Sequence, residues 1–360
     1  MCNIWKHPTH PDYELDIATL EKLPGGFDHI NVTGGEPTLR TDLLDICDAL
    51  HPKAKTLEIS TNGLRGYVLE KVIERYPDVK IRISVEGFEG TNDTIRGEKG
   101  GFEKKMEAME RLVAAGGTDL GFATTFQDEN IDEVVSLYQM SERLKVEFAT
   151  SALHNAFQFH KNDNTIYDRV RVAKRVENLV TEMLKSSSVK TWFRAYMNLG
   201  LIAKILGQDR LHPCTQGTDN VFIDPWGDVY ACNVRNDLLM GNLHLQSWEE
   251  VYNGARAEEV RTQVAGCPQN CWMVSSAKTA IRNKHVARLP KLAVLRWVAW
   301  NKIRVTLGRP ILFERYIDYS NVRIEPRVVK RRTYLTKPDK KQLQPAESRR
   351  YAQIGEFFNR

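Results

Sequence analysis

The stretch NVTGGEPTLR, residues 31–40, contains the features that decide the fold. An alternating run over residues 28–33 predicts a short strand, and two glycines, a glutamate and a proline follow it directly. Proline fixes its own φ and keeps the preceding Glu36 out of helical geometry. Glycine accepts positive φ and lets the backbone approach another group closely. The stretch therefore predicts a strand that ends in an open rim, where peptide groups and one carboxylate are exposed together.

Strand signals of the same kind recur along the first half of the chain, and helical patterns separate them. This alternation is typical of βαβ units and of a parallel sheet. In such sheets, ligands bind beyond the carboxyl ends of the strands, which is where the motifs GGEP, STNG and SVEG fall. The strands are expected at residues 29–34, 56–61, 80–85, 120–126 and 146–151, and the helices at 40–50, 67–76, 102–115 and 131–143.

The second half changes character after two helices expected within residues 165–206. Two short β runs in NVFIDPWGDVYAC, residues 220–232, flank a Pro-Trp-Gly-Asp turn and predict a hairpin. A helix is expected over 247–264, and CPQNCW follows at 267–272. The predicted parts are an α/β domain over residues 1–190, a small second domain over 191–287 and a basic extension over 288–360.

Composition describes an ordinary globular protein with one unusual segment. Its 360 residues are 42% hydrophobic and 27% charged, which suits two domains. No apolar run approaches the roughly 20 residues that span a bilayer, and no signal peptide is recognised, so we expect a cytoplasmic protein with reduced cysteines. Residues 281–360 hold 20 basic and 6 acidic side chains, a balance of +14, whereas the remainder balances at −9. The basic tail is therefore expected to have a role of its own.

Four of the six cysteines lie in the predicted second domain: Cys214, Cys232, Cys267 and Cys271. A glycine-containing turn can bring the first two together, and the last two are four residues apart. Four thiolates satisfy either a tetrahedral zinc ion or an iron–sulfur cluster, and the spacing alone leaves both open. The alternative is that these four cysteines are unrelated buried thiols. For Cys47, which lies on a predicted helix, a buried thiol is the interpretation we favour.

The order of the short motifs resembles that of radical S-adenosylmethionine (radical SAM) enzymes with a C-terminal auxiliary-cluster domain of the SPASM or twitch kind. The matching phrases MCNIW, GGEP, STNG, SVEG and IRGEKGGFEK begin at residues 1, 34, 60, 84 and 95, and C-x12-G-x4-C spans residues 214–232. Each phrase alone is weak, but together they are specific over about residues 1–275. The resemblance implies a partial (β/α)6 TIM-like barrel, with its first strand missing from this chain, followed by a small α+β auxiliary-cluster domain.

The resemblance also implies which residues hold the cofactors. In this family the GGEP rim binds the amino group of S-adenosylmethionine, and an ammonium needs only acceptors, which carbonyls and a carboxylate supply. Ser84 and Arg96 match positions that hold the methionine carboxylate, whereas Asn62 either lines the pocket or serves only its turn. The expected site residues are Gly34, Gly35, Glu36, Pro37, Asn62, Ser84 and Arg96 for S-adenosylmethionine, Cys2 for the radical SAM 4Fe–4S cluster, and Cys214, Cys232, Cys267 and Cys271 for an auxiliary 4Fe–4S cluster.

Two departures from the family pattern are present. Glu86 stands where the family usually has Asp. The radical SAM cluster takes three cysteines in C-x3-C-x2-C spacing, and this chain matches only the last of them, Cys2. A miscalled start codon, a trimmed chain and a degenerate relative without radical chemistry would each explain this. We expect the first, with a strand and two further cysteines encoded upstream.

The predicted function is a radical SAM oxidoreductase or maturase that cleaves S-adenosylmethionine reductively and abstracts hydrogen from a substrate C–H bond. Its auxiliary cluster would transfer electrons. Expected partners are a peptide, sugar or lipid-linked substrate and an electron donor such as flavodoxin or ferredoxin. No residue identifies itself as catalytic, but His154 and His160 are candidates for substrate contact. The alternative is an inactive zinc- or cluster-stabilised binding protein with a basic tail.

Residues 289–310 combine Leu, Val and Trp with four cations, which suits a helix at a membrane interface. The cations spread over more than half of the helical circumference, so a helix docked on the protein body explains the pattern equally well. Contact with a membrane surface and docking therefore both stay open, and contact with nucleic acid is not expected. Past residue 330 the chain turns polar and is expected to fray.

Overall fold

Five parallel strands form the main sheet of the computed structural model, which describes residues 1–10, 14–273, 276–278, 281 and 288–323. Their order follows the chain, β1-β2-β3-β4-β5, and all neighbouring pairs are parallel. This confirms the predicted α/β class and its five strands. The bounds are β1 (Ile30–Val32), β2 (Leu57–Thr61), β3 (Lys80–Ser84), β4 (Leu120–Phe126) and β5 (Glu147–Ala152).

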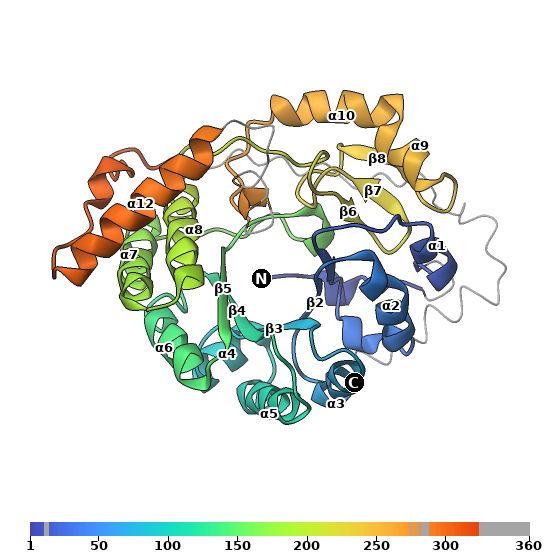
Figure 1. The fold of residues 1–360 in the computed structure, drawn as a ribbon, viewed down its shortest axis with the longest axis horizontal. Helices are drawn as coiled ribbons and strands as arrows, with labels where there is room; N and C mark the ends of the chain where they lie inside the picture. The colour runs from blue at the N-terminus through green and yellow to red at the C-terminus, as the bar shows by residue number, and fades with distance from the viewer. Residues whose placement is uncertain (11–13, 274–275, 279–280, 282–287, 324–360) are drawn as a thin grey trace.

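The connecting helices form an arc outside this sheet, and the N-terminus lies on its concave side (Figure 1). Side chains of alternate strand residues fill the space between the two layers. Ile59, Ile81 and Phe122, for example, are fully buried. The predicted domain boundary near residue 190 falls in the first turn of α8 and stays a prediction. The helices are α1 (Ile17–Glu21), α2 (Leu43–Leu50), α3 (Gly66–Arg75), α4 (Glu89–Arg96), α5 (Gly101–Ala114), α6 (Val134–Leu144), α7 (Arg169–Lys185) and α8 (Val189–Ile205).

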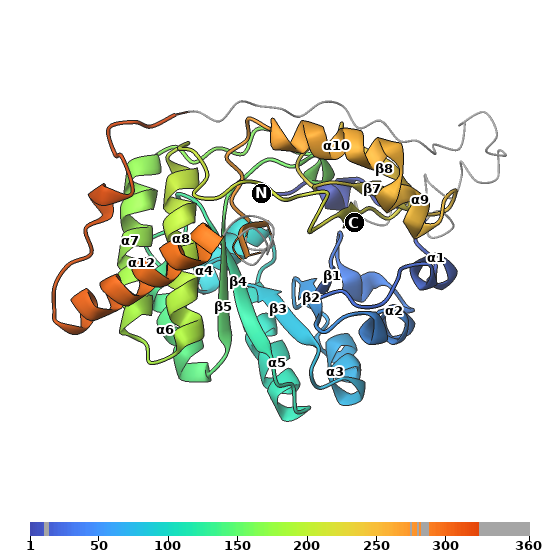
Figure 2. The ribbon, with the colours of Figure 1, turned by 45° about the horizontal axis from the view of Figure 1, so that its top comes forward.

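A small antiparallel sheet follows, at the end of the main sheet where the N-terminus also lies (Figure 2). It contains β6 (Phe222–Ile223), β7 (Asp228–Tyr230) and β8 (Leu239–Asn242). The β6–β7 pairing confirms the predicted hairpin. Gly227 has φ of 78° in its turn, a conformation that favours glycine.

The helix predicted over residues 247–264 is two helices, α9 (Trp248–Asn253) and α10 (Ala255–Ala265). Ser247 and Glu250 form a capping box at the start of α9. Gly254 between the helices is extended, with φ −70° and ψ 162°, so the helical hydrogen bonds cannot continue through it.

Helix α12 (Arg288–Thr306) packs along α7 and α8. Trp297 and Asn301 are buried on its inner face, and Lys302 Nζ donates to the carbonyl of Leu184 at 2.8 Å near the end of α7. These contacts confirm the docking interpretation of this segment.

The outer face of α12 carries exposed apolar side chains, including Trp300 and Ile303. None of the described helices is both long and apolar enough to cross a membrane. Contact between α12 and a membrane surface stays a prediction. The predicted fraying concerns residues past 330, which lie outside the described part of the chain.

Candidate functional site

The carboxyl ends of β1, β2 and β3 form one edge of the sheet, and three of the motifs meet there. The register pairs Val32 with Ile59 and Thr61 with Ile83, so the three strands end side by side. Gly34 has φ of 147°, and a Cβ added at Gly34 or Gly35 would meet nothing within 4 Å. The backbone of the GGEP loop is therefore open on one side, as a group that binds a ligand through its carbonyls must be.

Glu36 connects the GGEP loop to the STNG turn through its carboxylate. The residue is extended, as expected before Pro37, and it caps a short 3₁₀ helix (Pro37–Leu39). Oε1 accepts from Thr38 N at 3.1 Å and Thr61 Oγ1 at 2.8 Å. Oε2 accepts from Asn62 N at 2.7 Å. A carboxylate offers about four acceptor positions, so Oε2 can accept from a ligand ammonium in addition to Asn62 N.

Asn62 and Gly63 shape the turn after β2. Asn62 Oδ1 accepts from Leu64 N at 2.9 Å, which is an Asx turn. Gly63 has φ of 76°, and a Cβ there would come within 2.6 Å of Ile83 Cγ2, so the turn packs tightly on β3. The side-chain oxygen of Asn62 thus stabilises the turn by accepting this hydrogen bond, which is one of the two roles that the sequence left open.

Arg96 pairs with the buried carboxylate of Glu86. Ser84 is the last residue of β3 and half-buried, and Glu86 follows it with no exposed surface. Arg96, in the last turn of α4, donates through Nη2 to Glu86 Oε1, and Thr125 N donates to Glu86 Oε2 at 2.8 Å. Nε of Arg96 is buried and finds no acceptor among the described residues. The guanidinium therefore keeps a donor that a ligand carboxylate would satisfy.

Cys2 lies over the same edge, held by the loop after β5. Asn3 N donates to the carbonyl of Phe159 at 2.8 Å, and Asn164 Nδ2 donates to the carbonyl of Met1 at 2.9 Å. Burial raises the pKa of the Cys2 thiol, and the Ile4 N–H and the charge of Arg96 partly offset this. Arg96 and Cys2 are thus electrostatic neighbours.

A radical SAM cluster takes three thiolates, and the described residues supply one of them at this edge. The other cysteines lie in α2, in the case of Cys47, or in the second half of the chain. These residues alone do not fit the three-thiolate site.

The other four cysteines line one cavity beside the small sheet: Cys214, Cys232, Cys267 and Cys271. Burial raises the pKa of the Cys232 thiol, and the Cys214 and Cys267 thiols raise it further, while backbone N–H groups of Val234 and Arg235 oppose the rise. No three Cys, His, Asp or Glu side chains of the described ranges lie close enough together to hold one metal ion.

The groups around these thiols suit a thiolate-bound cluster. Arg235 Nη1 donates to Cys267 Sγ at 3.4 Å, and Arg210 donates to the carbonyl of Cys271. Positive charge and N–H donors at the sulfurs stabilise an anionic cluster and tune its potential. The four thiols line one cavity without converging on a single ion, which suits a multi-iron cluster better than one metal ion. Their role as ligands stays a prediction.

His154 and His160 lie in the loop after β5, beside the N-terminal segment. His154 Nδ1 lies 3.1 Å from the carbonyl of Ala152, and burial lowers the pKa of His154 to about 4. The imidazole is therefore neutral near pH 7, with Nε2 as an acceptor. Nε2 is buried without a hydrogen-bond partner in the described part of the chain. His160 instead stacks on His7 with ring centroids 4.0 Å apart, so His154 is the better candidate for substrate contact.

Sequence reasoning missed two residues behind this edge, Asn92 and Lys105. Asn92 is fully buried and Lys105 is 1% exposed. One signal for Lys105 was available, since it falls on the same helical stripe as the buried Ala108 and Leu112. A charge on an apolar stripe marks a buried polar contact rather than a solvated face.

Two family models each match part of the chain. A family model of the radical SAM superfamily matches residues 2–140, and one of the iron–sulfur cluster-binding SPASM domain matches residues 214–273. These matches confirm the resemblance drawn from the motifs and the expected cofactors, S-adenosylmethionine and 4Fe–4S clusters.

Curated relatives match part of the chain. The mycofactocin maturase MftC of Mycolicibacterium smegmatis is 27% identical over 236 residues, which cover 63% of this chain and 57% of that protein. The PqqA peptide cyclase of Methylobacterium sp. (strain 4-46) is 31% identical over 139 residues, 36% of each protein. The match thus spans little more than half the length of the first of these relatives.

A solved structure shares the fold. The native anSMEcpe with bound AdoMet and Cp18Cys peptide superposes with a TM-score of 0.51 at 13% sequence identity, covering 83% of this chain and 91% of that one. At this identity the likeness concerns the fold alone.

Proposed function

Because this chain carries a radical SAM domain followed by an iron–sulfur cluster-binding SPASM domain, we propose that it is a radical SAM maturase or oxidoreductase. Enzymes of this superfamily cleave S-adenosylmethionine reductively and use the 5′-deoxyadenosyl radical to abstract hydrogen from a C–H bond. The observation that carries the proposal is the meeting of the GGEP, STNG and SVEG motifs at one sheet edge, with Arg96 and Cys2 beside them.

The residues of this edge bind and orient S-adenosylmethionine in our proposal. The carbonyls of Gly34 and Gly35 and the Oε2 atom of Glu36 accept from the ammonium. Arg96 donates through Nε to the methionine carboxylate, with Ser84 beside it. An arginine fork suits a planar carboxylate, and the buried Glu86 fixes the guanidinium in place.

Cys214, Cys232, Cys267 and Cys271 would hold an auxiliary 4Fe–4S cluster in their cavity, and this cluster would supply electron transfer. Four thiolate ligands leave no open iron position, which favours electron transfer over direct ligation of the substrate. Such a site calls for a small electron donor, such as flavodoxin or ferredoxin, as a partner.

A peptide is the substrate class that we favour. The names of two relatives, a mycofactocin maturase and a PqqA peptide cyclase, support this. His154 Nε2, a neutral buried acceptor near the N-terminal segment, would accept from an N–H of such a substrate.

A Glu36→Gln variant tests the S-adenosylmethionine site. The substitution keeps the shape of the side chain but removes its charge, so we expect affinity for S-adenosylmethionine to fall by about 1–3 kcal/mol, the scale of one charge-assisted hydrogen bond. Anaerobic calorimetry measures this. Glu74→Ala, on the exposed outer side of α3, is the matched control and should bind like the unmodified chain. Equal affinity of all three proteins would contradict the assignment.

A further inference from the structure

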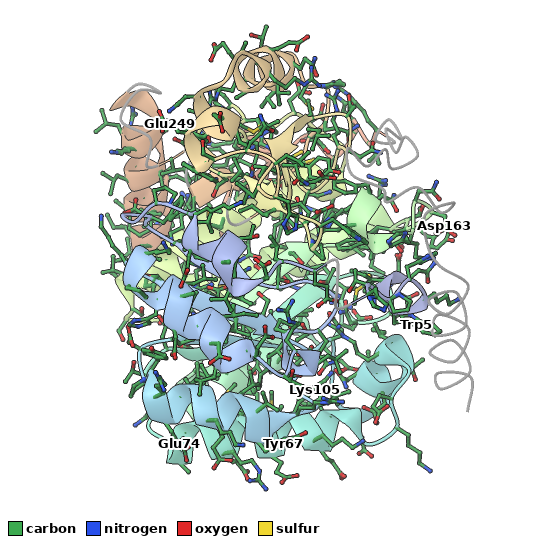
Figure 3. All side chains as sticks on the ribbon, turned by 90° about the vertical axis from the view of Figure 1, so that its right-hand side faces the viewer. Trp5, Tyr67, Glu74, Lys105, Asp163 and Glu249 are labelled. Carbon is green, nitrogen blue, oxygen red and sulfur yellow. The ribbon has the colours of Figure 1, made fainter. Side chains whose placement is uncertain are left out.

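Lys105 is a charged side chain buried inside the main domain. It is 1% exposed, and in Figure 3 it lies toward the interior, whereas Tyr67 and Glu74 lie at the outer surface. A buried ammonium is costly unless it is hydrogen-bonded. Nζ donates to Asn92 Oδ1 at 2.9 Å, and a Cβ on Gly63 would come within 3.3 Å of Lys105 Cγ. One side chain thus contacts both the STNG turn and α4.

A chain of hydrogen bonds leads from Lys105 to the sheet edge. Asn92 Oδ1, which accepts from Lys105, also accepts from Glu86 N at 3.2 Å. The Glu86 carboxylate in turn accepts from Arg96. This series of hydrogen bonds ends at Arg96, whose Nε is a buried donor without an acceptor among the described residues. Buried networks of this kind rigidify their members when each one is satisfied, which here requires an acceptor for Arg96 Nε.

We propose that Lys105 is a positioning residue for S-adenosylmethionine, because it holds Asn92 and Glu86 so that Arg96 meets the methionine carboxylate. Its stem supports the turn that contains Gly63, and its ammonium anchors the segment that carries Glu86. The two halves of the ligand site are therefore fixed relative to one another by one residue below the sheet edge. This inference rests on the proposed function, since it assigns the ligand of Arg96.

The charges around Lys105 give the proposal a pH signature. Burial lowers the pKa of Lys105 to about 8, and Arg96 lowers it as well, whereas Glu86, Asp93 and Glu98 raise it. A ligand carboxylate at Arg96 favours the protonated amine. The affinity for S-adenosylmethionine is therefore highest below this pKa. It falls as the pH rises through the pKa, because the ammonium then loses its proton.

A Lys105→Met variant removes the ammonium and keeps the stem beside Gly63. Lys104→Met is the matched control, since Lys104 is half exposed and pairs with Glu98 at the surface. Equilibrium dialysis of labelled S-adenosylmethionine against each full chain, from about pH 6.5 to about pH 9.5, gives the affinities. The amino group of the ligand also titrates near pH 8, but it does so equally for all chains, so affinity ratios isolate Lys105.

We expect Lys105→Met to bind about tenfold more weakly near pH 7, the scale of one hydrogen bond to a charged group. The affinity of Lys104→Met for S-adenosylmethionine should stay within about twofold of that of the unmodified chain, because a surface ion pair contributes little. The deficit of Lys105→Met should shrink above about pH 8, because the unmodified chain then loses the same charge. A merely structural role would give a deficit that does not depend on pH. Lys105→Gln, which keeps a donor without the charge, gives the same comparison if the Met variant does not fold.

An Arg96→Ala variant distinguishes an error in the role of Lys105 from an error in the proposed S-adenosylmethionine site. If Arg96→Ala loses binding while Lys105→Met matches the unmodified chain at every pH, Lys105 has no positioning role and this inference is wrong. If the unmodified chain itself binds no S-adenosylmethionine, the proposed function fails and the inference fails with it.

Discussion

A Cys232→Ala variant is expected to lose most of the iron bound in the four-cysteine cavity. Cys232 lines this cavity with the other three thiols and lies electrostatically close to Cys214 and Cys267. Its removal would leave one iron of the proposed cluster without a thiolate. Iron and acid-labile sulfide per chain, measured after anaerobic reconstitution, give the result.

Cys47→Ala is the control for this experiment. Cys47 is fully buried in α2, and burial raises the pKa of its thiol to about 12, so it stays protonated and is no ligand. This variant should retain the iron of the unmodified chain. An iron content of Cys232→Ala equal to that of Cys47→Ala would refute the role of Cys232.

A Gly200→Ala variant is expected to destabilise the fold by about 1–3 kcal/mol, as overpacking of a core does. A Cβ on Gly200 in α8 would lie 2.0 Å from Trp272 Cε2. Trp272 is buried, and its Nε1 donates to the carbonyl of Met197 at 2.8 Å, so the ring cannot move aside without losing that bond. Because Cys271 precedes Trp272, cluster loading should fall as well. Denaturant unfolding measures the free energy.

Gly90→Ala provides the matched comparison. Gly90 lies in α4, and a Cβ there meets nothing within 4 Å. Alanine is the better helix former, so this variant should be as stable as the unmodified chain or slightly more stable. Identical unfolding free energies for Gly200→Ala and Gly90→Ala would show that Trp272 does not pack against α8 as described.

The alternation of strands and helices could be predicted because local patterns carry it. Each run of β-branched and aromatic residues, such as residues 120–126, became a strand with nearly the expected bounds. Strand β8 was not predicted, because four residues that include Gly241 have little strand propensity and their pairing with β7 depends on distant residues. Helix α4 was not predicted, because its sequence EGTNDTIR has few apolar residues to form a stripe.

The location of the candidate site could be predicted, but its hydrogen bonds could not. Motif order and the parallel sheet placed Glu36 at the carboxyl edge. That Glu36 receives hydrogen bonds from Thr61 and Asn62 depends on how β1 and β2 lie side by side, which no local pattern specifies. The burial of Lys105 is of the same kind, since Asn92 and Gly63 reach it from different segments.

The metal content of the unmodified chain distinguishes the proposed iron–sulfur enzyme from a zinc-stabilised binding protein. The chain would be purified and reconstituted without oxygen, and its iron, acid-labile sulfide and zinc would be measured per chain. We expect a brown protein with about four iron and four sulfide in the four-cysteine cavity. A colourless protein with about one zinc and no sulfide would contradict this expectation and indicate a zinc-stabilised binding protein instead.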